Sequence, residues 1–408
     1  MLTARQIELV KATVPVLHEH GVALTSHFYK RMLTGNPELK NLFNQVHQAR
    51  GHQQKALAGA VLAYAEHIEN PAVLLPAVKH IATKHCTIGI RAEHYPIVGK
   101  HLLASIKEVL GDAATDELIE AWGAAYGQLA DLLIGVEGGI YKEQANEEGG
   151  WSGWRPFVVT KRVEETPNVV SFTLTPADGG KVPAYKPGQF VSVRAYLPDV
   201  KFVQPRQYSL SRAPLNNNEL RISVKRADAH GDIPAGLMSN HLHANLKVGS
   251  TIDVYAPTGE FFLAEGTNPV VLVAGGIGIG ITPLFAMLET IAEKTPQRPV
   301  TMVQVAHDNA DLPLAAEVRA ECGKLANLKA AVYLTRAQAC DKTCGCPFVN
   351  YGKRPSAADI KSLAPTADSD VYICGPMKFM DDMRTAFVEA GVPAEKIHTE
   401  AFGTGNQS

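Results

Sequence analysis

The chain has 408 residues, of which 46% are hydrophobic and 20% are charged, and its net charge is −2. The length allows roughly two to four domains, each with its own core, and the nearly neutral charge argues against nucleic acid as a main partner. No apolar run approaches the roughly 20 residues of a membrane-spanning helix, and no secretory signal precedes the first helical segment. We therefore expect a cytoplasmic protein with no stable membrane association.

Residues 1–146 predict an all-α domain, because helical periodicity runs through almost all of them. One helix is expected over Ala72–Ile81, with Gly89 as a break after it. His85 would then lie at the end of a helix whose apolar face lines a core. A single histidine in such a place is usually an ordinary core or surface residue, so periodicity alone defines only the fold class of this domain.

Residues 151–264 predict an antiparallel β-barrel, which follows a polar, glycine-containing linker at 146–150. Short β-rich segments are separated by proline, glycine and asparagine, a spacing typical of small barrels. These segments cover 157–163, 169–175, 189–194, 206–211, 220–226 and 251–255.

Residues 265–408 predict a doubly wound α/β domain. The apolar run Pro269–Ala274 is typical of a parallel strand buried on both faces, and a glycine-rich loop and a helical pattern follow it. Further strands expected at 300–306, 331–334 and 371–374 alternate with helical stretches, which is the order of a doubly wound fold.

The glycine-rich loop joins the apolar strand to a helix, and its glycines let backbone amides approach a pyrophosphate. Thr282 can cap the helix, and Pro283 suits its first turn. The candidate nucleotide-binding residues are Gly275, Gly276, Gly278, Gly280, Thr282 and Pro283.

The segment 205–210 carries residues suited to a flavin. Arg206 and Tyr208 share one face of the expected strand, and a flavin needs a cation near its pyrophosphate and an aromatic ring against its face. Gln207 and Ser209 share the other face, with hydrogen-bonding groups for the polar ring edge. The segment resembles the flavin motif of the ferredoxin–NADP reductase superfamily, although an edge strand with a chance arginine and tyrosine would look the same.

The same resemblance implies further cofactor residues. It places Phe190 at the flavin, where close relatives often carry tyrosine, and it places Ser239 and Asn240 near the flavin pyrophosphate at a helix start. Cys374 and Gly375 would lie by the nicotinamide. The C-terminal segment whose aromatic ring covers the flavin in that superfamily is matched by Glu400, Phe402 and Gly403.

The helical part and the reductase motifs together resemble the flavohaemoglobin family over the whole chain. The matching residues of the helical part are Tyr29, Phe43, Gln53, Leu57, Lys84, His85, Tyr95 and Glu137. The resemblance implies that His85 is the proximal haem ligand and that Lys84 lies beside it. Tyr95 and Glu137 would hydrogen-bond the histidine and raise its basicity.

On the distal side, the resemblance implies that Tyr29 and Gln53 donate hydrogen bonds to the oxygen ligand. Leu57 and Phe43 would pack around the haem. Electrons would pass from NAD(P)H to FAD and then to haem b, because FAD converts a two-electron hydride into single electrons. The implied activity is dioxygenation of nitric oxide to nitrate, with O₂, nitric oxide and NAD(P)H as partners. A lipid or other hydrophobic ligand in the haem pocket is compatible with this family.

Other functions stay open at this point. One is an oxygen-binding or sensing globin whose reductase only keeps the iron ferrous, and reduction of alkyl hydroperoxides is a further activity of the family. Another is a haem-free flavin reductase with a helical interaction domain. Nitric oxide consumption coupled to NADH oxidation distinguishes the first from a dioxygenase, and a Soret band dismisses the last.

Two details concern the nicotinamide cofactor. We expect NADH rather than NADPH, because the acidic Asp308 follows the second strand of the nucleotide domain and would repel a 2′-phosphate. Relatives read Gly-Gly-x-Gly-x-Thr-Pro in the glycine-rich loop, and this chain has two residues more. The glycines that approach the pyrophosphate are therefore either Gly276 with Gly278 or Gly278 with Gly280. We expect the extra residues to bulge on the strand side and to weaken NADH binding.

Three cysteines, Cys340, Cys344 and Cys346, cluster late in the chain. They could form a metal or redox site, but no histidine or further cysteine nearby completes four ligands. Reduced thiols on an exposed loop are the simpler interpretation.

Overall fold

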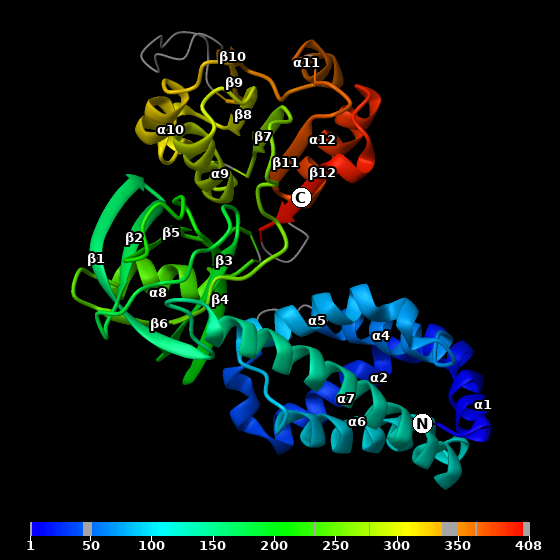
Figure 1. Cartoon of the computed structure of the whole chain (residues 1–408). Helices are drawn as coiled ribbons and strands as arrows, with labels where there is room; N and C mark the ends of the chain where they lie inside the picture. The colour runs from blue at the N-terminus through cyan, green and yellow to red at the C-terminus, as the bar shows by residue number, and fades with distance from the viewer. Residues whose placement is uncertain are drawn as a thin grey trace. The chain divides into compact units, whose positions relative to one another are not determined.

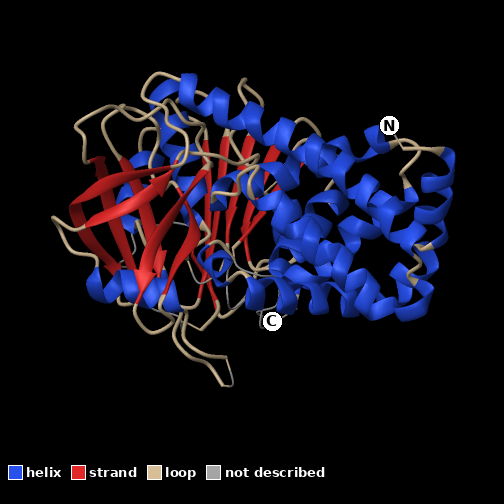
Figure 2. Cartoon of the chain, turned by 90° about the horizontal axis from the view of Figure 1, so that it is seen from below, coloured by secondary structure: helices blue, strands red, loops and turns tan. Residues whose placement is uncertain are grey.

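The structure is a computed structural model that describes residues 2–43, 51–231, 233–276, 278–336, 349–363 and 365–402. The chain divides into two compact units. The first holds Met1–Glu147 with the short segments Trp151–Trp154 and Arg194–Arg206, and the second holds the remainder. The N-terminal part is built of helices, and the strands follow it in the chain (Figure 1, Figure 2).

The N-terminal part is all-α, as the sequence predicts. Its helices are α1 (Ala4–Ala12), α2 (Val14–Gly35), α4 (His52–Glu66), α5 (Leu75–Ile88), α6 (His94–Leu110) and α7 (Asp116–Asn146). The connections contain the 3-10 turns η1 (Pro37–Asn41), η2 (Pro71–Leu74) and η3 (Gly111–Ala113). Within the described ranges, none of the helices combines the length and the apolar composition that a bilayer crossing requires.

Helix α5 carries His85, and its two ends have identifiable causes. The expected start at 72 is wrong by three residues, because those residues form the 3-10 turn and Pro76 sits in the first turn of α5, where a missing amide costs nothing. Gly89 ends the helix with a φ of +84°, a conformation that favours glycine. The Ile90 amide then donates to the carbonyl of His85 at 3.0 Å, so the backbone of His85 is held in the last turn.

Two apolar clusters support this domain. The larger one joins α2, α4, α6 and α7 and includes Leu24, Phe28, Tyr29, Val61, Ile106 and Trp122. The smaller one surrounds α5 and includes Val78, Ala82, Tyr95, Ala130 and Leu133. Helix α7 contributes to both, so it links the packing of α5 to that of the other helices.

The middle of the chain forms the expected antiparallel barrel. Its strands are β1 (Trp154–Thr166), β2 (Val169–Pro176), β3 (Phe190–Leu197), β4 (Phe202–Ser209), β5 (Leu220–Lys225) and β6 (Thr251–Tyr255). They are ordered β4-β3-β6-β1-β2-β5. An antiparallel bridge between Leu210, just after β4, and Ile222 of β5 connects the two ends of the sheet. Helix α8 (Leu237–Asn245) lies between β5 and β6 in the chain.

The C-terminal part is the expected doubly wound α/β domain. Its parallel sheet has the order β10-β9-β8-β7-β11-β12. The strands are β7 (Val270–Ala274), β8 (Val300–Ala306), β9 (Leu328–Leu334), β10 (Val349–Tyr351), β11 (Asp370–Gly375) and β12 (Ile397–Ala401). The helices are α9 (Ile281–Lys294), α10 (Ala315–Cys322), α11 (Ala357–Ser362) and α12 (Met377–Glu389).

Strand β7 shows why this sheet needs helices on both faces. Its residues 270, 272 and 274 belong to the cluster that contains α9, whereas residues 271 and 273 belong to the cluster that contains α12. Successive side chains of a strand point to opposite faces, so a strand that is apolar at every position must be covered on both faces. The apolar run in the sequence therefore predicts the central strand correctly.

Candidate functional site

His85 is fixed through one nitrogen of its imidazole. Its Nδ1 lies 2.8 Å from Oε1 of Glu137 and 3.2 Å from the hydroxyl of Tyr95. Glu137, on α7, is only 2% exposed, so its carboxylate needs these partners. The carboxylate fixes the proton on Nδ1, and within the described part of the chain Nε2 makes no hydrogen bond. Nε2 is therefore the nitrogen that can bind a metal.

Tyr95 completes this group from the start of α6. Its hydroxyl donates to the same Oε1 of Glu137 at 2.5 Å. Burial and this hydrogen bond raise the pKa of Tyr95 far above its ordinary value, so the phenol stays protonated and acts as a donor. The sequence comparison with the family thus names three residues that the structure brings together: His85, Tyr95 and Glu137.

Two tyrosines of α7 also belong to this arrangement, although neither is among the site residues expected from the sequence. Tyr126 donates to the carbonyl of Tyr95 at 2.6 Å, and Tyr141 donates to the carbonyl of Ile90, directly after α5. Tyr126 lies against Gly99, where an added Cβ would be 2.6 Å from its ring. The signal was present in the sequence, because positions 126, 130, 133, 137 and 141 share one helical face.

The residues expected on the distal side come from α2, α4 and the segment after η1. Tyr29 is buried, and its ring meets Phe43 edge-on with centroids 5.8 Å apart. Gln53 and Leu57 are half-buried and one turn apart on α4. Lys84 is exposed, beside His85 but pointing away from the core.

Tyr29 is only 9% exposed, and it packs in the core cluster formed by α2, α4, α6 and α7. Burial raises its pKa well above the ordinary value, so it is a donor and not a phenolate. A metal-binding imidazole nitrogen and a buried hydroxyl donor fit an iron porphyrin with a small oxygen-containing ligand.

The flavin motif lies at the C-terminal end of β4. Arg206 and Tyr208 are both half-buried, as expected for side chains on one face of the strand, whereas Gln207 is exposed and Ser209 is buried, so the burial of these two does not follow the expected shared face. Arg206 donates to the carbonyl of Pro205 at 2.6 Å. On β3, Phe190 forms an antiparallel bridge with Thr258.

Ser239 and Asn240 lie in the first turn of α8 but bind protein backbone. Ser239 accepts the amide of Ala227 at 3.1 Å, and Asn240 donates to the carbonyl of Ala227 at 2.8 Å. Both therefore fix the loop after β5 against the helix start. The backbone amides of this turn remain the groups suited to a pyrophosphate.

The glycine-rich loop and the Cys374 segment meet at the carboxyl ends of the central strands β7 and β11 of the parallel sheet. Ala274 pairs with Cys374 at the ends of β7 and β11, and the amide of Gly275 donates to the carbonyl of Cys374 at 2.8 Å. Glu400 pairs with Cys374 from the other side. The strand order reverses between β7 and β11, because β8 lies on one side of β7 and β11 lies on the other. The carboxyl ends of the strands at such a point are the usual place for a ligand in this kind of sheet.

The loop itself corrects one expectation. Helix α9 begins at Ile281 with Gly280 as its N-cap residue, so the assignment of Thr282 as the cap is wrong. The hydroxyl of Thr282 donates instead to the carbonyl of Ile279 at 3.1 Å. Pro283 lies in the first turn, as expected. Gly278 has a φ of +80° and leaves no room for a Cβ, which would lie 2.0 Å from the carbonyl oxygen of Asp311.

The extra residues of the loop are therefore packed and not loose. A Cβ at Gly280 would lie 2.3 Å from the carbonyl oxygen of Cys374, so this glycine contacts β11 directly. The position of Gly278 is fixed by the turn after β8. Gly276 and Gly278 both need positive φ, whereas Gly280 does not.

Two charged residues lie near this end of the sheet. Nζ of Lys225, the last residue of β5, is 3.5 Å from the carbonyl oxygen of Gly276, and burial lowers its pKa. No local pattern in the sequence singles out Lys225, because its contact with Gly276 joins segments that are far apart in the chain. Asp308 is exposed after β8 and caps the turn η4 (Asn309–Asp311).

Of the remaining candidate residues, Phe402 lies among those that the structure describes. Phe402 packs against the cluster around α9. Gly403, Cys340, Cys344 and Cys346 lie outside the described residues. Among the residues that the structure describes, no group of three or more histidine, cysteine or acidic side chains is arranged to hold a metal ion.

Comparison with known families defines the class of the chain. The family described as Globin matches residues 26–133, the oxidoreductase FAD-binding domain matches residues 156–263, and the oxidoreductase NAD-binding domain matches residues 272–385. The fold and the site thus define a globin joined to a flavin- and nicotinamide-dependent reductase.

Full-length relatives carry the same arrangement. The flavohemoprotein of Bordetella parapertussis is 50% identical, and that of Chromobacterium violaceum is 51% identical, each over 99% of both chains. The crystal structure of a flavohemoglobin from Malassezia yamatoensis with bound FAD and heme is 32% identical, with a TM-score of 0.82 over 98% of this chain and 100% of that one. The FAD/NAD binding domain of nitric oxide dioxygenase from Vibrio cholerae is 35% identical over 61% of this chain and 99% of that one, with a TM-score of 0.54. The chain belongs to the flavohemoprotein family.

Proposed function

We propose that this chain is a nitric oxide dioxygenase that converts nitric oxide and O₂ to nitrate at the expense of NADH. When bound, haem b supplies the iron at which the two gases react, and FAD supplies the conversion of a hydride into single electrons. The observation that carries the proposal is the His85–Glu137–Tyr95 group in a flavohemoprotein chain. A histidine backed by a buried carboxylate is more electron-donating than an oxygen carrier requires.

The protein groups have separate tasks in this proposal. Glu137 and Tyr95 hold the proton of His85 on Nδ1, so that Nε2 is the ligand atom. Tyr29 keeps its proton and would donate a hydrogen bond to the diatomic ligand, with Gln53 as a second donor. Leu57 and Phe43 pack against the same apolar cluster as Tyr29 and would exclude water from the ligand.

The reductase residues are proposed by the same reasoning. FAD would be held by Arg206, Gln207, Tyr208, Ser209, the first turn of α8 and Phe190, and covered by the segment Glu400–Gly403. NADH would bind at the end of the sheet formed by the glycine-rich loop and the segment Cys374–Gly375, with Lys225 as a further cation. The acidic Asp308 supports NADH over NADPH.

The domain boundaries 1–146, 151–264 and 265–408 form part of the proposal, and each of the three family matches falls within one of them. A reaction that consumes NADH suits the cytoplasm, where we place the protein. We also propose that the haem pocket can take a lipid or another hydrophobic ligand.

The test is His85→Ala in the full chain, with His80→Ala, an exposed histidine of the same helix, as the matched control. His85→Ala should lose haem and nitric oxide consumption while FAD stays bound and NADH still reduces an artificial acceptor. The unmodified protein should consume roughly two nitric oxide molecules per NADH, because each conversion to nitrate uses one of the two electrons. NADH oxidation without nitric oxide consumption in the haem-loaded protein contradicts the proposal.

A further inference from the structure

Helix α9 connects the glycine-rich loop with the barrel. Its first turn follows the loop, whereas three side chains further along the helix, Phe285, Met287 and Glu289, meet residues of the barrel. All of these contacts lie within one compact unit of the chain. The proposed NADH site is therefore joined through a single helix to the part of the barrel that carries proposed flavin residues.

Glu289 holds the backbone that directly follows the flavin motif of β4. Oε2 of Glu289 accepts the amide of Ala213 at 2.6 Å, and Oε1 lies 3.8 Å from Nε of Arg212. The hydroxyl of Tyr185 donates to the carbonyl of Arg212 at 2.9 Å, so the backbone of Arg212 is held as well. The position of the segment Ser211–Ala213 therefore depends on a side chain of α9.

A second carboxylate holds the same segment through Arg221 of β5. Arg221 donates from Nε to the carbonyl of Ser211 at 3.0 Å, and its Nη1 lies 2.9 Å from both carboxylate oxygens of Glu317 on α10. Its guanidinium also lies over the ring of Phe285, 5.3 Å from the ring centroid. Arg221 is only 6% exposed, so its charge needs these partners. Glu289 and Glu317 thus act on one segment from two helices.

A further contact of α9 lies beside β3. An added Cβ at Gly188 would lie 2.5 Å from Cε of Met287, and Gly188 has a φ of +109°. Phe190, the residue of β3 assigned to the flavin, is two positions further along the chain. Helix α9 therefore touches the chain next to both strands that carry proposed flavin residues, β3 and β4.

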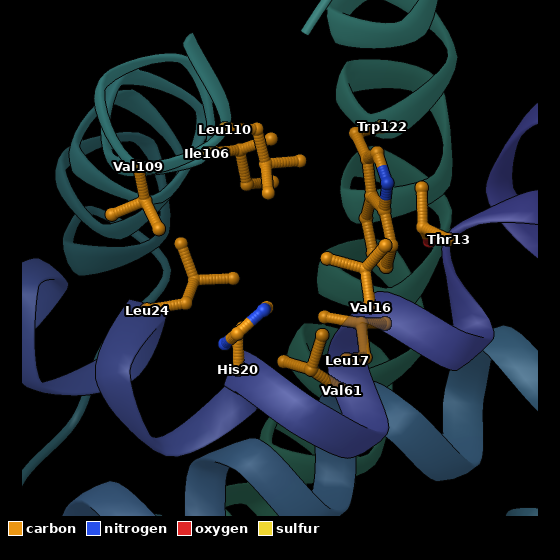
Figure 3. Close-up of a pocket in the computed structure, with 10 residues that line it drawn as sticks. All are labelled: Thr13, Val16, Leu17, His20, Leu24, Val61, Ile106, Val109, Leu110 and Trp122. Carbon is orange, nitrogen blue, oxygen red and sulfur yellow. The ribbon is translucent and has the colours of Figure 1, made fainter. Parts of the chain in front are cut away.

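The buried charge of Glu289 distinguishes this contact from the packing in the helical unit. Aliphatic side chains and Trp122 make up most of the lining of a recess there, and the atoms that face it are apolar (Figure 3). Apolar contacts between helices tolerate small sliding movements, whereas a hydrogen bond is confined to a narrow range of length and angle. Glu289 is only 7% exposed, and burial raises its pKa. Such a carboxylate adds little stability, so the geometry that it imposes is the better account of it.

We propose that Glu289, supported by Glu317, is a positioning residue that sets the distance and angle between the nicotinamide and the flavin for hydride transfer. The inference rests on the reductase half of the proposed function. There, C4 of NADH gives a hydride, which is two electrons and one proton, to N5 of the flavin, so NADH is oxidised to NAD⁺ and the flavin is reduced. Glu289 acts through the backbone of Ser211–Ala213 and not by contact with either cofactor.

The experiment uses the haem- and FAD-loaded full chain and three variants of α9. Glu289→Ala removes the acceptor of the Ala213 amide, whereas Glu289→Gln keeps an acceptor oxygen without the charge. Glu293→Ala is the matched control, because Glu293 is exposed one turn further along α9 and pairs with Lys324 at 2.6 Å. Anaerobic stopped-flow mixing with NADH gives the limiting rate of flavin reduction and the apparent Kd of NADH.

Two further measurements do not depend on turnover. Hydrogen exchange of the peptide that contains Ala213 reports whether its amide is protected before NADH is added. Addition of NAD⁺ to the photoreduced protein gives a charge-transfer absorbance, whose strength depends on how the nicotinamide and flavin rings stack. Together they separate a change in the position of the rings from a general loss of structure.

Glu289→Ala should lower the limiting rate of flavin reduction about tenfold or more, since a displacement of about 1 Å can cost roughly 100-fold in rate. The apparent Kd of NADH should change less than about twofold, because the interaction that is lost matters only when the hydride moves. Exchange at Ala213 should accelerate, and the charge-transfer absorbance should weaken. Glu289→Gln should recover most of the lost rate and protect Ala213 again, and Glu293→Ala should change none of these quantities.

Glu317→Ala tests the same segment if Glu289→Ala does not fold, because the side chain of Glu317 is 43% exposed. It should also lower the limiting rate. An unchanged limiting rate in the folded variants, a weaker apparent affinity for NADH in place of slower reduction, or loss of FAD would each overturn the proposal. A Glu289→Gln variant that is as slow as Glu289→Ala would overturn it too.

None of these measurements involves nitric oxide. Failure of the haem-loaded protein to consume nitric oxide would therefore contradict the proposed dioxygenase and leave the positioning role of Glu289 intact. Normal consumption of nitric oxide together with an unchanged limiting rate in Glu289→Ala would do the reverse.

Discussion

Replacing Glu137 with glutamine removes the negative charge behind His85 and keeps the shape of the side chain. The amide oxygen can still accept from Nδ1 of His85 and from the hydroxyl of Tyr95, which now bind one carboxylate oxygen at 2.8 and 2.5 Å. A carboxylate draws the Nδ1 proton toward itself and makes the imidazole a stronger donor to iron. Stronger donation favours ferric iron, so we expect Glu137→Gln to raise the reduction potential of the haem.

The size of the change follows from the loss of charge. A hydrogen bond to a charged group contributes about 1.5–3 kcal/mol and a neutral one about 0.5–1.5 kcal/mol, so the bond to His85 weakens by roughly 1 kcal/mol. For a one-electron couple, a tenfold change in equilibrium constant is about 59 mV, and 1 kcal/mol is therefore about 43 mV. Part of the bond strength is common to both oxidation states, so the expected rise is at most about 40 mV.

The assay is a spectroelectrochemical titration of the haem, together with the iron–histidine stretching frequency, which should fall. Tyr95→Phe is the informative control, because it removes the competing donor from Oε1 of Glu137 and leaves the charge for His85. Its potential should stay or fall, opposite to Glu137→Gln. An unchanged or lower potential in Glu137→Gln, with His85 still bound to iron, would refute the reasoning.

Three further outcomes are expected. Tyr29→Phe removes a hydrogen bond worth roughly 1.5–3 kcal/mol, so O₂ dissociation measured by stopped flow should accelerate about tenfold or more, and an unchanged rate would show that this hydroxyl does not reach the ligand. Asp308→Arg should raise the ratio of kcat/KM for NADPH to that for NADH, and a native enzyme that prefers NADPH would overturn this expectation. Gly99→Ala places a Cβ 2.6 Å from the ring of Tyr126 and should lower the stability of the helical domain by about 1–3 kcal/mol in thermal unfolding. Gly123→Ala, whose Cβ meets its nearest neighbour at 3.6 Å, should not.

The fold class could be predicted because it follows from patterns among residues that are close together in the sequence. The doubly buried strand β7 is an uninterrupted apolar run, and the end of α5 is marked by Gly89. Contacts between distant segments were not predictable in this way. Gly280, and not Thr282, precedes α9 because Gly280 packs on the carbonyl of Cys374, far along the chain.

The site divides along the same line. His85 on its own gave no role, and its partnership with Glu137 came from resemblance to a family and not from spacing. Lys225 was missed because its neighbour at the glycine-rich loop is distant in sequence. Tyr126 and Tyr141 were missed for a different reason. Their spacing from Glu137 shows that the three residues share one face of α7, but the sequence of one helix does not show which atoms their polar groups will contact.

Helix α7 has a consequence for how this chain can change in evolution. Its polar tips at positions 126, 137 and 141 meet the carbonyl of Tyr95, the imidazole of His85 and the carbonyl of Ile90. One inserted or deleted residue between 126 and 141 would rotate one end of the helix by about 100° and shift it by about 1.5 Å. If the residues on one side of the change kept their contacts, those on the other side would be turned away from their partners, so at least one of the three contacts would be lost. The stretch is therefore open to substitution at its other positions but closed to changes of length, and insertions accepted by the family should fall before Tyr126 or after Tyr141.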